Sequence, residues 1–222
     1  MKFLAIIQAR LGSSRLPGKV LKKINNKTIL EFLIDRLKLS KKIDKIVIAT
    51  TSSIKDKKIL KILKQKKISY YTGSEKNVLQ RYYRCAKKFN AKNIIRITSD
   101  CPLLDYRIVD KVVTKFEKSK VDYASNSLKL SYPDGMDFEV FNFKTLKETF
   151  LNAKSKHDQE HVCPYMRRSK KFKLLNIPYK KNYSFLRLTV DHQDDLTLCN
   201  RIMEKLDNKS SFSLEDIISV YK

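Results

Sequence analysis

The sequence predicts an α/β protein with a mostly parallel, helix-covered sheet. Apolar runs of strand length alternate with amphipathic runs of helix length, which is the rhythm of βαβ units. Polar residues follow the apolar runs directly, as they do where parallel strands end at a ligand site. A chain of 222 residues is long enough for one substantial domain with a full core. We therefore expect a single domain over 1–222, in which 131–168 forms an excursion for substrate or dimer contacts.

Predicted strands and helices alternate regularly in the first half of the chain. Strands are expected over 3–8, 45–50, 69–71 and 93–98, and helices over 29–39, 54–66 and 77–89. Apolar runs of this kind, each separated by a helix, favour parallel neighbours buried on both faces.

The pattern changes after about residue 125. Residues 131–141 combine a polar turn with an alternating strand, and a helix is expected over 143–153. The stretch 154–168 is polar, and an apolar strand near 183–190 ends at Asp191. Asp194 and Asp195 are expected to begin the last helix, where acidic side chains interact favourably with the helix dipole.

The loop after the first strand has the composition of a phosphate site. Arg10, Arg15 and Lys19 place three cations within ten residues, and Gly12 and Gly18 let the backbone approach an anion closely. The glycines do not have P-loop spacing, and the dinucleotide-binding fingerprint is also missing. A purely structural connection is the alternative interpretation.

Two aspartates follow predicted strands and could hold a metal ion. Asp100 follows the strand over 93–98, and Asp191 follows the strand over 183–190. Hard carboxylate oxygens suit Mg²⁺, which neutralises charge on phosphates during nucleotidyl transfer. Either residue alone fits a helix cap or a turn equally well. Their similar positions at strand ends favour a metal pair.

A second polar group could contact an acceptor. It consists of Asp134, Asp137, Glu139 and His161. These side chains could bind sugar hydroxyls or an ammonium group, or they could mark a turn and a helix start. The sequence leaves both interpretations open.

Charge and cysteine content narrow the function classes. The net charge of +25 suggests a nucleic-acid partner, but most of the excess is lysine spread over helix-like segments such as 55–67, without a recognition motif. Solvated lysine-rich faces are the preferred explanation of the net charge.

Four scattered cysteines predict reduced thiols. With no apolar run long enough to span a membrane and no signal peptide, we expect a cytoplasmic protein.

Several motifs in order give the chain a family resemblance. It resembles the cytidylyltransferases that activate acidic sugars, the CMP-Kdo and CMP-sialate synthetase group, and especially the SpsF-type branch of spore-coat and surface polysaccharide synthesis. The resemblance rests on the motifs at 8–19, 73–81, 96–103, 132–141, 160–162 and 187–191. It implies a three-layer α/β/α nucleotide-diphospho-sugar transferase fold, with CTP as donor and a homodimer assembled through the second half.

The resemblance also implies roles for individual residues. Those for CTP binding are Gln8, Ala9, Arg10, Gly12, Ser13, Arg15, Lys19, Gly73, Ser74, Arg81 and Asp100, of which Arg10, Arg15, Lys19 and Asp100 would be catalytic. Asp100 and Asp191 resemble the metal-binding carboxylates, and Asp134, Asp137, Glu139 and His161 occupy the acceptor-sugar region. Asn77, Gln80, Ser99 and residues 192–194 depart from the usual family pattern.

These features predict that a sugar hydroxyl or sugar phosphate attacks the α-phosphate of CTP and releases pyrophosphate. Catalysis would come from positioning and electrostatics, and no residue is an obvious general base. Two alternatives are a metal-dependent glycosyltransferase that uses a nucleotide-sugar donor and a non-catalytic, basic nucleic-acid-binding domain.

Overall fold

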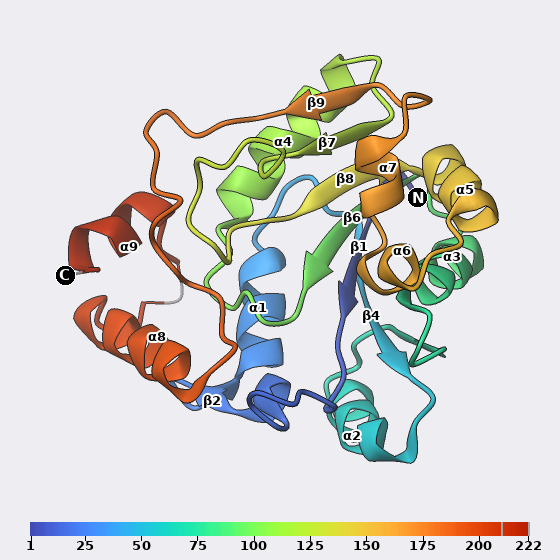
Figure 1. Cartoon of the computed structure of the whole chain (residues 1–222). Helices are drawn as coiled ribbons and strands as arrows, with labels where there is room; N and C mark the ends of the chain where they lie inside the picture. Colours follow the sequence, from blue (N-terminus) through green and yellow to red (C-terminus); the bar gives the residue numbers. More distant parts are fainter. Residues whose placement is uncertain (210, 222) are drawn as a thin grey trace.

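A seven-stranded sheet forms the centre of the protein (Figure 1). The computed structural model describes residues 1–209 and 211–221. The strand order is β5-β4-β1-β6-β8-β7-β9, and only β8 runs antiparallel to its two neighbours. The strands are β1 (Phe3–Gln8), β4 (Lys45–Thr51), β5 (Tyr70–Gly73), β6 (Asn93–Thr98), β7 (Tyr123–Ser125), β8 (Glu139–Asn142) and β9 (Leu174–Asn176), and β2 (Lys23–Ile24) pairs with β3 (Lys27–Thr28) in a separate ribbon.

Helices cover both faces of this sheet. The first hydrophobic cluster contains residues of α1 (Ile29–Leu37), α2 (Lys57–Gln65), α4 (Tyr106–Lys118), α8 (Gln193–Lys205) and α9 (Leu214–Val220). The second cluster contains residues of α3 (Val78–Lys88), α5 (Phe143–Asn152) and α7 (Pro164–Arg168). Helix α6 (Lys156–His161) lies against α3. Along β1, Phe3, Ala5 and Ile7 face the first cluster, whereas Leu4 and Ile6 face the second. This alternation is the strand period of two, and it confirms the predicted three-layer α/β/α fold.

Several elements differ from the sequence prediction. Helix α4 follows β6 without having been expected, and the polar stretch 154–168 forms the short helices α6 and α7. Strands β7 and β9 are also additional, and α9 follows α8, so the helix that Asp194 and Asp195 begin is not the last one. No helix in the described part of the chain is long and apolar enough to cross a membrane.

The predicted strand over 183–190 is wrong. This segment makes only an isolated parallel bridge, between Asp134 and Arg187, instead of a ladder in the sheet. Its apolar alternation is real, because Leu186, Leu188 and Val190 are buried. Its backbone partners lie in loops: the N–H of Leu188 donates to the carbonyl of Asp134, and the N–H of Val190 donates to that of Asp100. The segment is extended but is joined to two strand-end loops.

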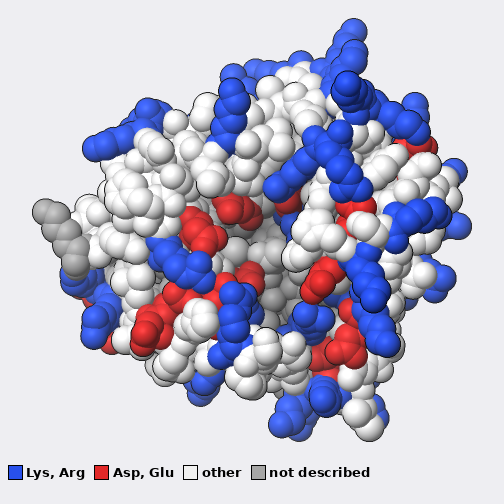
Figure 2. Space-filling view, viewed as in Figure 1, with Lys and Arg blue, Asp and Glu red and all other residues white. Residues whose placement is uncertain are grey.

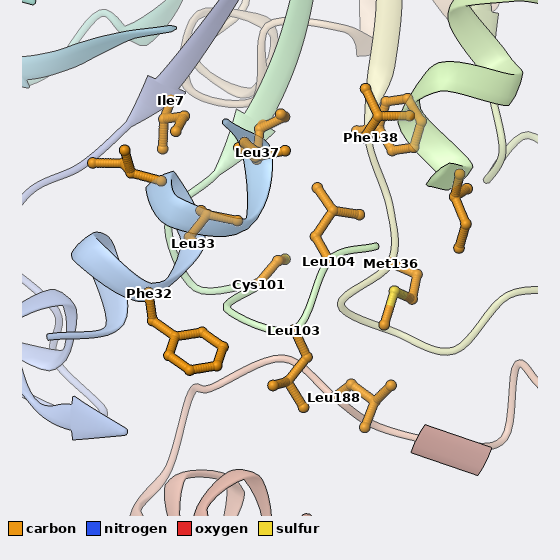
Figure 3. Close-up of a cluster of buried hydrophobic side chains, with 14 of the residues drawn as sticks. Ile7, Phe32, Leu33, Leu37, Cys101, Leu103, Leu104, Met136, Phe138 and Leu188 are labelled. Carbon is orange, nitrogen blue, oxygen red and sulfur yellow. The ribbon is translucent and has the colours of Figure 1, made fainter. Parts of the chain in front are cut away.

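The core continues beneath these loops. Leu103, Leu104, Met136 and Leu188 lie in one apolar cluster with Leu33 of α1 (Figure 3). Burial of such side chains is worth about 1.5–3 kcal/mol each. The polar loops at the carboxyl ends of the strands are therefore anchored to the main core.

Arg36 reinforces that anchor from α1. Its side chain is 2% exposed and donates hydrogen bonds to the carbonyls of Leu103, Leu104 and Phe212. Its guanidinium also lies 3.6 Å from the centre of the Phe212 ring. A buried cation thus satisfies backbone carbonyls that loops would otherwise leave without partners.

Gly135 permits the close approach between the two loops. Its φ is +96°, and a Cβ there would lie 2.5 Å from the Thr189 nitrogen. Only glycine fits both this backbone conformation and this contact.

We expect Gly135→Ala to lower the free energy of unfolding by more than about 3 kcal/mol, because it adds a clash to left-handed strain. Gly18→Ala is the matched control: Gly18 also has positive φ, but a Cβ there meets nothing within 4 Å. The control should cost about 1 kcal/mol. Urea unfolding of both variants measures the difference, and equal losses would contradict the role of the loop contact.

Candidate active site

Two cavities meet at the carboxyl ends of β1 and β6. The first has a volume of about 340 Å³ and the second about 370 Å³, and both are lined by Arg96, Thr98 and Asp100. Figure 2 shows acidic side chains around a hollow in the centre of one face, with basic side chains over the surrounding surface. The structure thus offers two adjoining cavities that share part of one wall.

The loop after β1 lines the first cavity. Of the predicted nucleotide-binding residues, Gln8, Ala9, Arg10, Gly12, Ser13, Arg15, Lys19, Arg81 and Asp100 all lie there. The carbonyl of Leu11 accepts hydrogen bonds from the N–H groups of Ser13 and Gly18, which closes the loop on itself. Asp56 accepts a hydrogen bond of 2.7 Å from the Leu11 N–H and ties the loop to the next unit. The cations are therefore carried by an anchored backbone.

Arg81 connects the remaining two nucleotide-site candidates to this cavity. Gly73 and Ser74 are not lining residues, but the Arg81 guanidinium donates to the Ser74 carbonyl, and a Cβ on Gly73 would lie 3.3 Å from the Arg81 Cγ. The Arg81 Nε is buried without a hydrogen-bond partner among the described residues. Because buried polar groups are normally satisfied, an ordered water or a polar ligand is the expected partner.

Lys19 lies between the two candidate metal ligands. Its ammonium is 2.8 Å from Asp100 Oδ2 and 2.9 Å from Asp191 Oδ1. Burial alone would lower the pKa of Lys19, but attraction and hydrogen bonds from the two carboxylates raise it above its ordinary value. Burial likewise opposes ionisation of Asp191, yet hydrogen bonding and attraction from Lys19 hold the pKa of that carboxyl below its usual range. Lys19 and Asp191 are therefore both charged at neutral pH.

The donor atoms around Lys19 fit a divalent cation. Two hard carboxylate oxygens from distant segments converge on one position of positive charge. Mg²⁺ is commonly held by one or two carboxylates together with substrate phosphates. No group of three or more His, Cys, Asp or Glu residues able to hold a metal occurs over 1–209 and 211–221. The site thus matches a metal that arrives with phosphates.

The structure divides the predicted acceptor-site residues. Asp134, Asp137 and Glu139 line the second cavity, whereas His161 lines the first. Glu139 is 5% exposed, and its two oxygens accept hydrogen bonds from Arg96 at 2.8 Å and Arg167 at 2.7 Å. Glu139 is therefore an organising ion-pair partner between two arginines.

Asp137 differs from its neighbours in the second cavity. Burial, followed by repulsion from Asp134 and Glu139, raises its pKa to about 7, although Arg167 opposes the shift. A carboxyl with this pKa changes its protonation state near neutral pH.

His161, which lines the first cavity, is followed by a strained turn. Val162 has φ +67° and ψ −53°, and the N–H of Cys163 donates to the His161 carbonyl at 2.7 Å. This is a γ-turn, which is rare for a β-branched residue. Buried Asp158 binds Arg168 through both oxygens, at 2.5 Å each, and ties α6 to α7. An ion pair thus joins the two helices on either side of the strained turn.

Sequence reasoning gave no role to three arginines around the cavities. Arg96 and Arg187 lie within the quoted motifs, and Arg167 lies in the polar stretch 154–168. Arg96 had a usable signal, because it is the charged residue in the otherwise largely apolar strand β6. Its pairing with Glu139 depends on the register between β6 and β8, where the two residues lie opposite each other.

The chain is similar to known proteins in both sequence and structure. Residues 4–217 match a protein-family model described as cytidylyltransferase. An uncharacterized protein of Methanocaldococcus jannaschii is 39% identical, covering 93% of this chain and 85% of its own. The spore coat polysaccharide biosynthesis protein SpsF of Bacillus subtilis is 29% identical over 98% of this chain and 92% of its own. A solved cytidylyltransferase structure from Leptospira borgpetersenii has a TM-score of 0.95 and 34% identity, covering 99% of this chain and 93% of the other.

Asp137→Asn should change how stability depends on pH. The folded-state pKa of about 7 lies above the unfolded value of about 3.9, so stability is lost as pH rises between these values. The variant lacks this loss, and we expect it to be more stable than the wild type by roughly 1–3 kcal/mol at pH 8, with little difference near pH 4.

Urea unfolding at pH 4.5, 6 and 8 measures this effect. Asp207→Asn is the control, because the Asp207 side chain is 82% exposed. Parallel stability profiles for wild type and Asp137→Asn would contradict the predicted ionisation.

Proposed function

We propose that this chain, which belongs to the cytidylyltransferase family, transfers CMP from CTP to a sugar or sugar phosphate and releases pyrophosphate. Its family membership confirms the resemblance seen in the motifs and identifies the chain as a nucleotidyltransferase. The observation that carries the finer proposal is the position of Lys19 between Asp100 and Asp191, at the junction of two cavities.

The first cavity is the proposed CTP site. Arg10, Arg15 and Lys19 bind the phosphates through charge-assisted hydrogen bonds, and Gly12 and Ser13 offer backbone and hydroxyl groups beside them. The buried guanidinium of Arg81, with Gly73 and Ser74 behind it, supports the base and ribose end. Gln8 and Ala9 complete the wall at the end of β1.

Asp100 and Asp191 are the proposed Mg²⁺ ligands. When bound, the metal offsets charge on the CTP phosphates. Lys19 and Arg15 contact Asp191 in the structure. In the complex we assign both cations to the phosphates, where they stabilise charge on the departing pyrophosphate. The protein contributes orientation and electrostatic stabilisation, without a covalent intermediate.

The second cavity is the proposed acceptor site. Asp134 and Asp137 accept hydrogen bonds from sugar hydroxyls, Glu139 fixes the two arginines beside them, and His161 approaches from the nucleotide side. A hydroxyl or phosphate oxygen of the acceptor attacks the α-phosphate in line. The shared residue Asp100 places this attack where the cavities meet.

We assign the reaction to surface polysaccharide or glycoconjugate synthesis in the cytoplasm. The likeness to SpsF supports the pathway, and four buried, unpaired cysteines fit a reducing compartment. We also propose a homodimer that uses residues 131–168. Leu151, which is 52% exposed, lies in this region. Family membership favours this reaction over the glycosyltransferase and nucleic-acid-binding alternatives.

The nucleotide and acceptor can be tested together. Pyrophosphate release should be fastest with CTP when all four nucleoside triphosphates are compared across a panel of acidic sugars, neutral sugars and sugar phosphates. Mass spectrometry should identify a CMP- or CDP-linked product. Turnover with another nucleotide and none with CTP would refute the proposal.

Lys19→Ala should lower kcat/KM for CTP by about 10²–10³-fold, as expected when a charged group at a developing phosphate anion is lost. Lys23→Ala is the matched control, since Lys23 is exposed and lies outside both cavities. Steady-state kinetics and thermal melts of both variants make the comparison. Near-wild-type activity of Lys19→Ala would assign the loop a purely structural role.

A further inference from the structure

The side chain of Arg187 binds three carboxylates from three different segments. Its Nη1 is 2.6 Å from Asp134 Oδ2, its Nη2 is 2.9 Å from Asp191 Oδ2, and its Nε is 3.0 Å from Asp195 Oδ1. Asp134 precedes β8, Asp191 follows the extended segment, and Asp195 lies in the first turn of α8. One guanidinium therefore joins the acceptor cavity, the metal-site carboxylate and a helix.

Arg187 fixes the orientation of the Asp191 carboxylate. It holds Oδ2, whereas Arg15 and Lys19, which line the first cavity, contact Oδ1 at 2.7 and 2.9 Å. The two oxygens of Asp191 therefore have different partners. Oδ2 is tied to the scaffold, and Oδ1 is presented to the groups that bind phosphate.

The same guanidinium also acts on the backbone of Asp191 through Asp195. Asp195 Oδ2 accepts hydrogen bonds of 2.8 Å from the N–H groups of Asp191 and His192. Its other oxygen is held by Arg187. Arg187 thus restrains Asp191 directly at the side chain and indirectly at the main chain.

We propose that Arg187 is a positioning residue that aims Asp191 Oδ1 at the divalent metal and couples it to Asp134 in the acceptor cavity. Arg187 is not among the described residues that line either cavity, so it acts through these carboxylates. The inference rests on the proposed function, because it assigns the metal to Asp100 and Asp191. Arginine suits this task because its planar fork holds several oxygens in fixed directions, which lysine cannot do.

The first test measures metal affinity in the CTP complex. Arg187→Met should weaken Mn²⁺ binding, read from free Mn²⁺ by electron paramagnetic resonance, by about 10- to 100-fold, as expected when a partner of a metal ligand is lost. Arg187→Lys should restore only part of the affinity. Calorimetric affinity for CTP in EDTA should stay within about twofold of wild type, because Arg10, Arg15 and Lys19 are intact.

The second test does not need the nucleotide. Lys19→Met removes the ammonium between Asp100 and Asp191, so Mn²⁺ should bind this variant without CTP. Adding Arg187→Met to this variant should again weaken Mn²⁺ binding by about 10- to 100-fold. Arg107→Met is the matched control: Arg107 is 45% exposed and pairs with Asp105, and its loss should leave Mn²⁺ affinity unchanged.

The outcomes separate the two proposals. Failure of wild type to bind CTP would refute the proposed function, while the nucleotide-free comparison still tests Arg187. Equal Mn²⁺ affinity with and without the Arg187 side chain, in either setting, would overturn the positioning role. So would a loss of CTP affinity in EDTA as large as the loss of Mn²⁺ affinity. Absence of Mn²⁺ binding in every form of the protein would refute the metal site and the role built on it.

Discussion

The ion-pair contact of Lys19 with Asp100 and Asp191 is the interaction on which the site depends. The two carboxylates come from loops far apart in sequence, and each would repel the other if left alone. A buried charge is costly unless it is paired and hydrogen-bonded. The ammonium makes their proximity possible. Because Lys19 also lines the first cavity, the group that holds the two carboxylates together is the one to which the proposed function assigns the phosphates.

The chain is basic as a whole, whereas its second cavity is lined mainly by acidic side chains. The chain carries +25 overall, yet Asp100, Asp134, Asp137, Glu139 and Asp191 line the second cavity against only two arginines, Arg96 and Arg167. A basic surface raises the local concentration of an anionic nucleotide, and an acidic cavity wall repels anions and attracts cations. The overall charge of the chain therefore says little about which ligand the second cavity binds.

Local sequence patterns predicted the parts of the fold that depend on local physics. Strand β6 was predicted with its observed bounds because its apolar run is uninterrupted except at Arg96, and the cation-rich loop was evident because its charges are neighbours in sequence. Helix α4 was missed although its signal is present, with buried apolar residues at 108, 109, 112, 113 and 116 after the cap Asp105. Strands β7 and β9 have three residues each, too few for a period to be recognised.

Local sequence patterns could not predict contacts between segments that lie far apart in the chain. The alternation of 183–190 indicated an extended segment but could not say that its partners are loops. The ion pair of Arg96 with Glu139 exists because two antiparallel strands meet in one register. The turn at Val162 that follows His161 has positive φ, a conformation that a β-branched residue does not predict.

The two-cavity layout has an evolutionary consequence. Apart from Glu160 and His161, the described residues that line the first cavity lie within 8–100, and those that line the second lie within 96–191, with Arg96, Thr98 and Asp100 in common. Substitutions in the later segment that spare Glu160, His161, Arg187 and Asp191 can reshape the second cavity while the lining of the first stays intact. In a duplicated gene with this architecture, drift in one half of the chain would alter the second cavity alone, and the shared wall of Arg96, Thr98 and Asp100 would limit that drift.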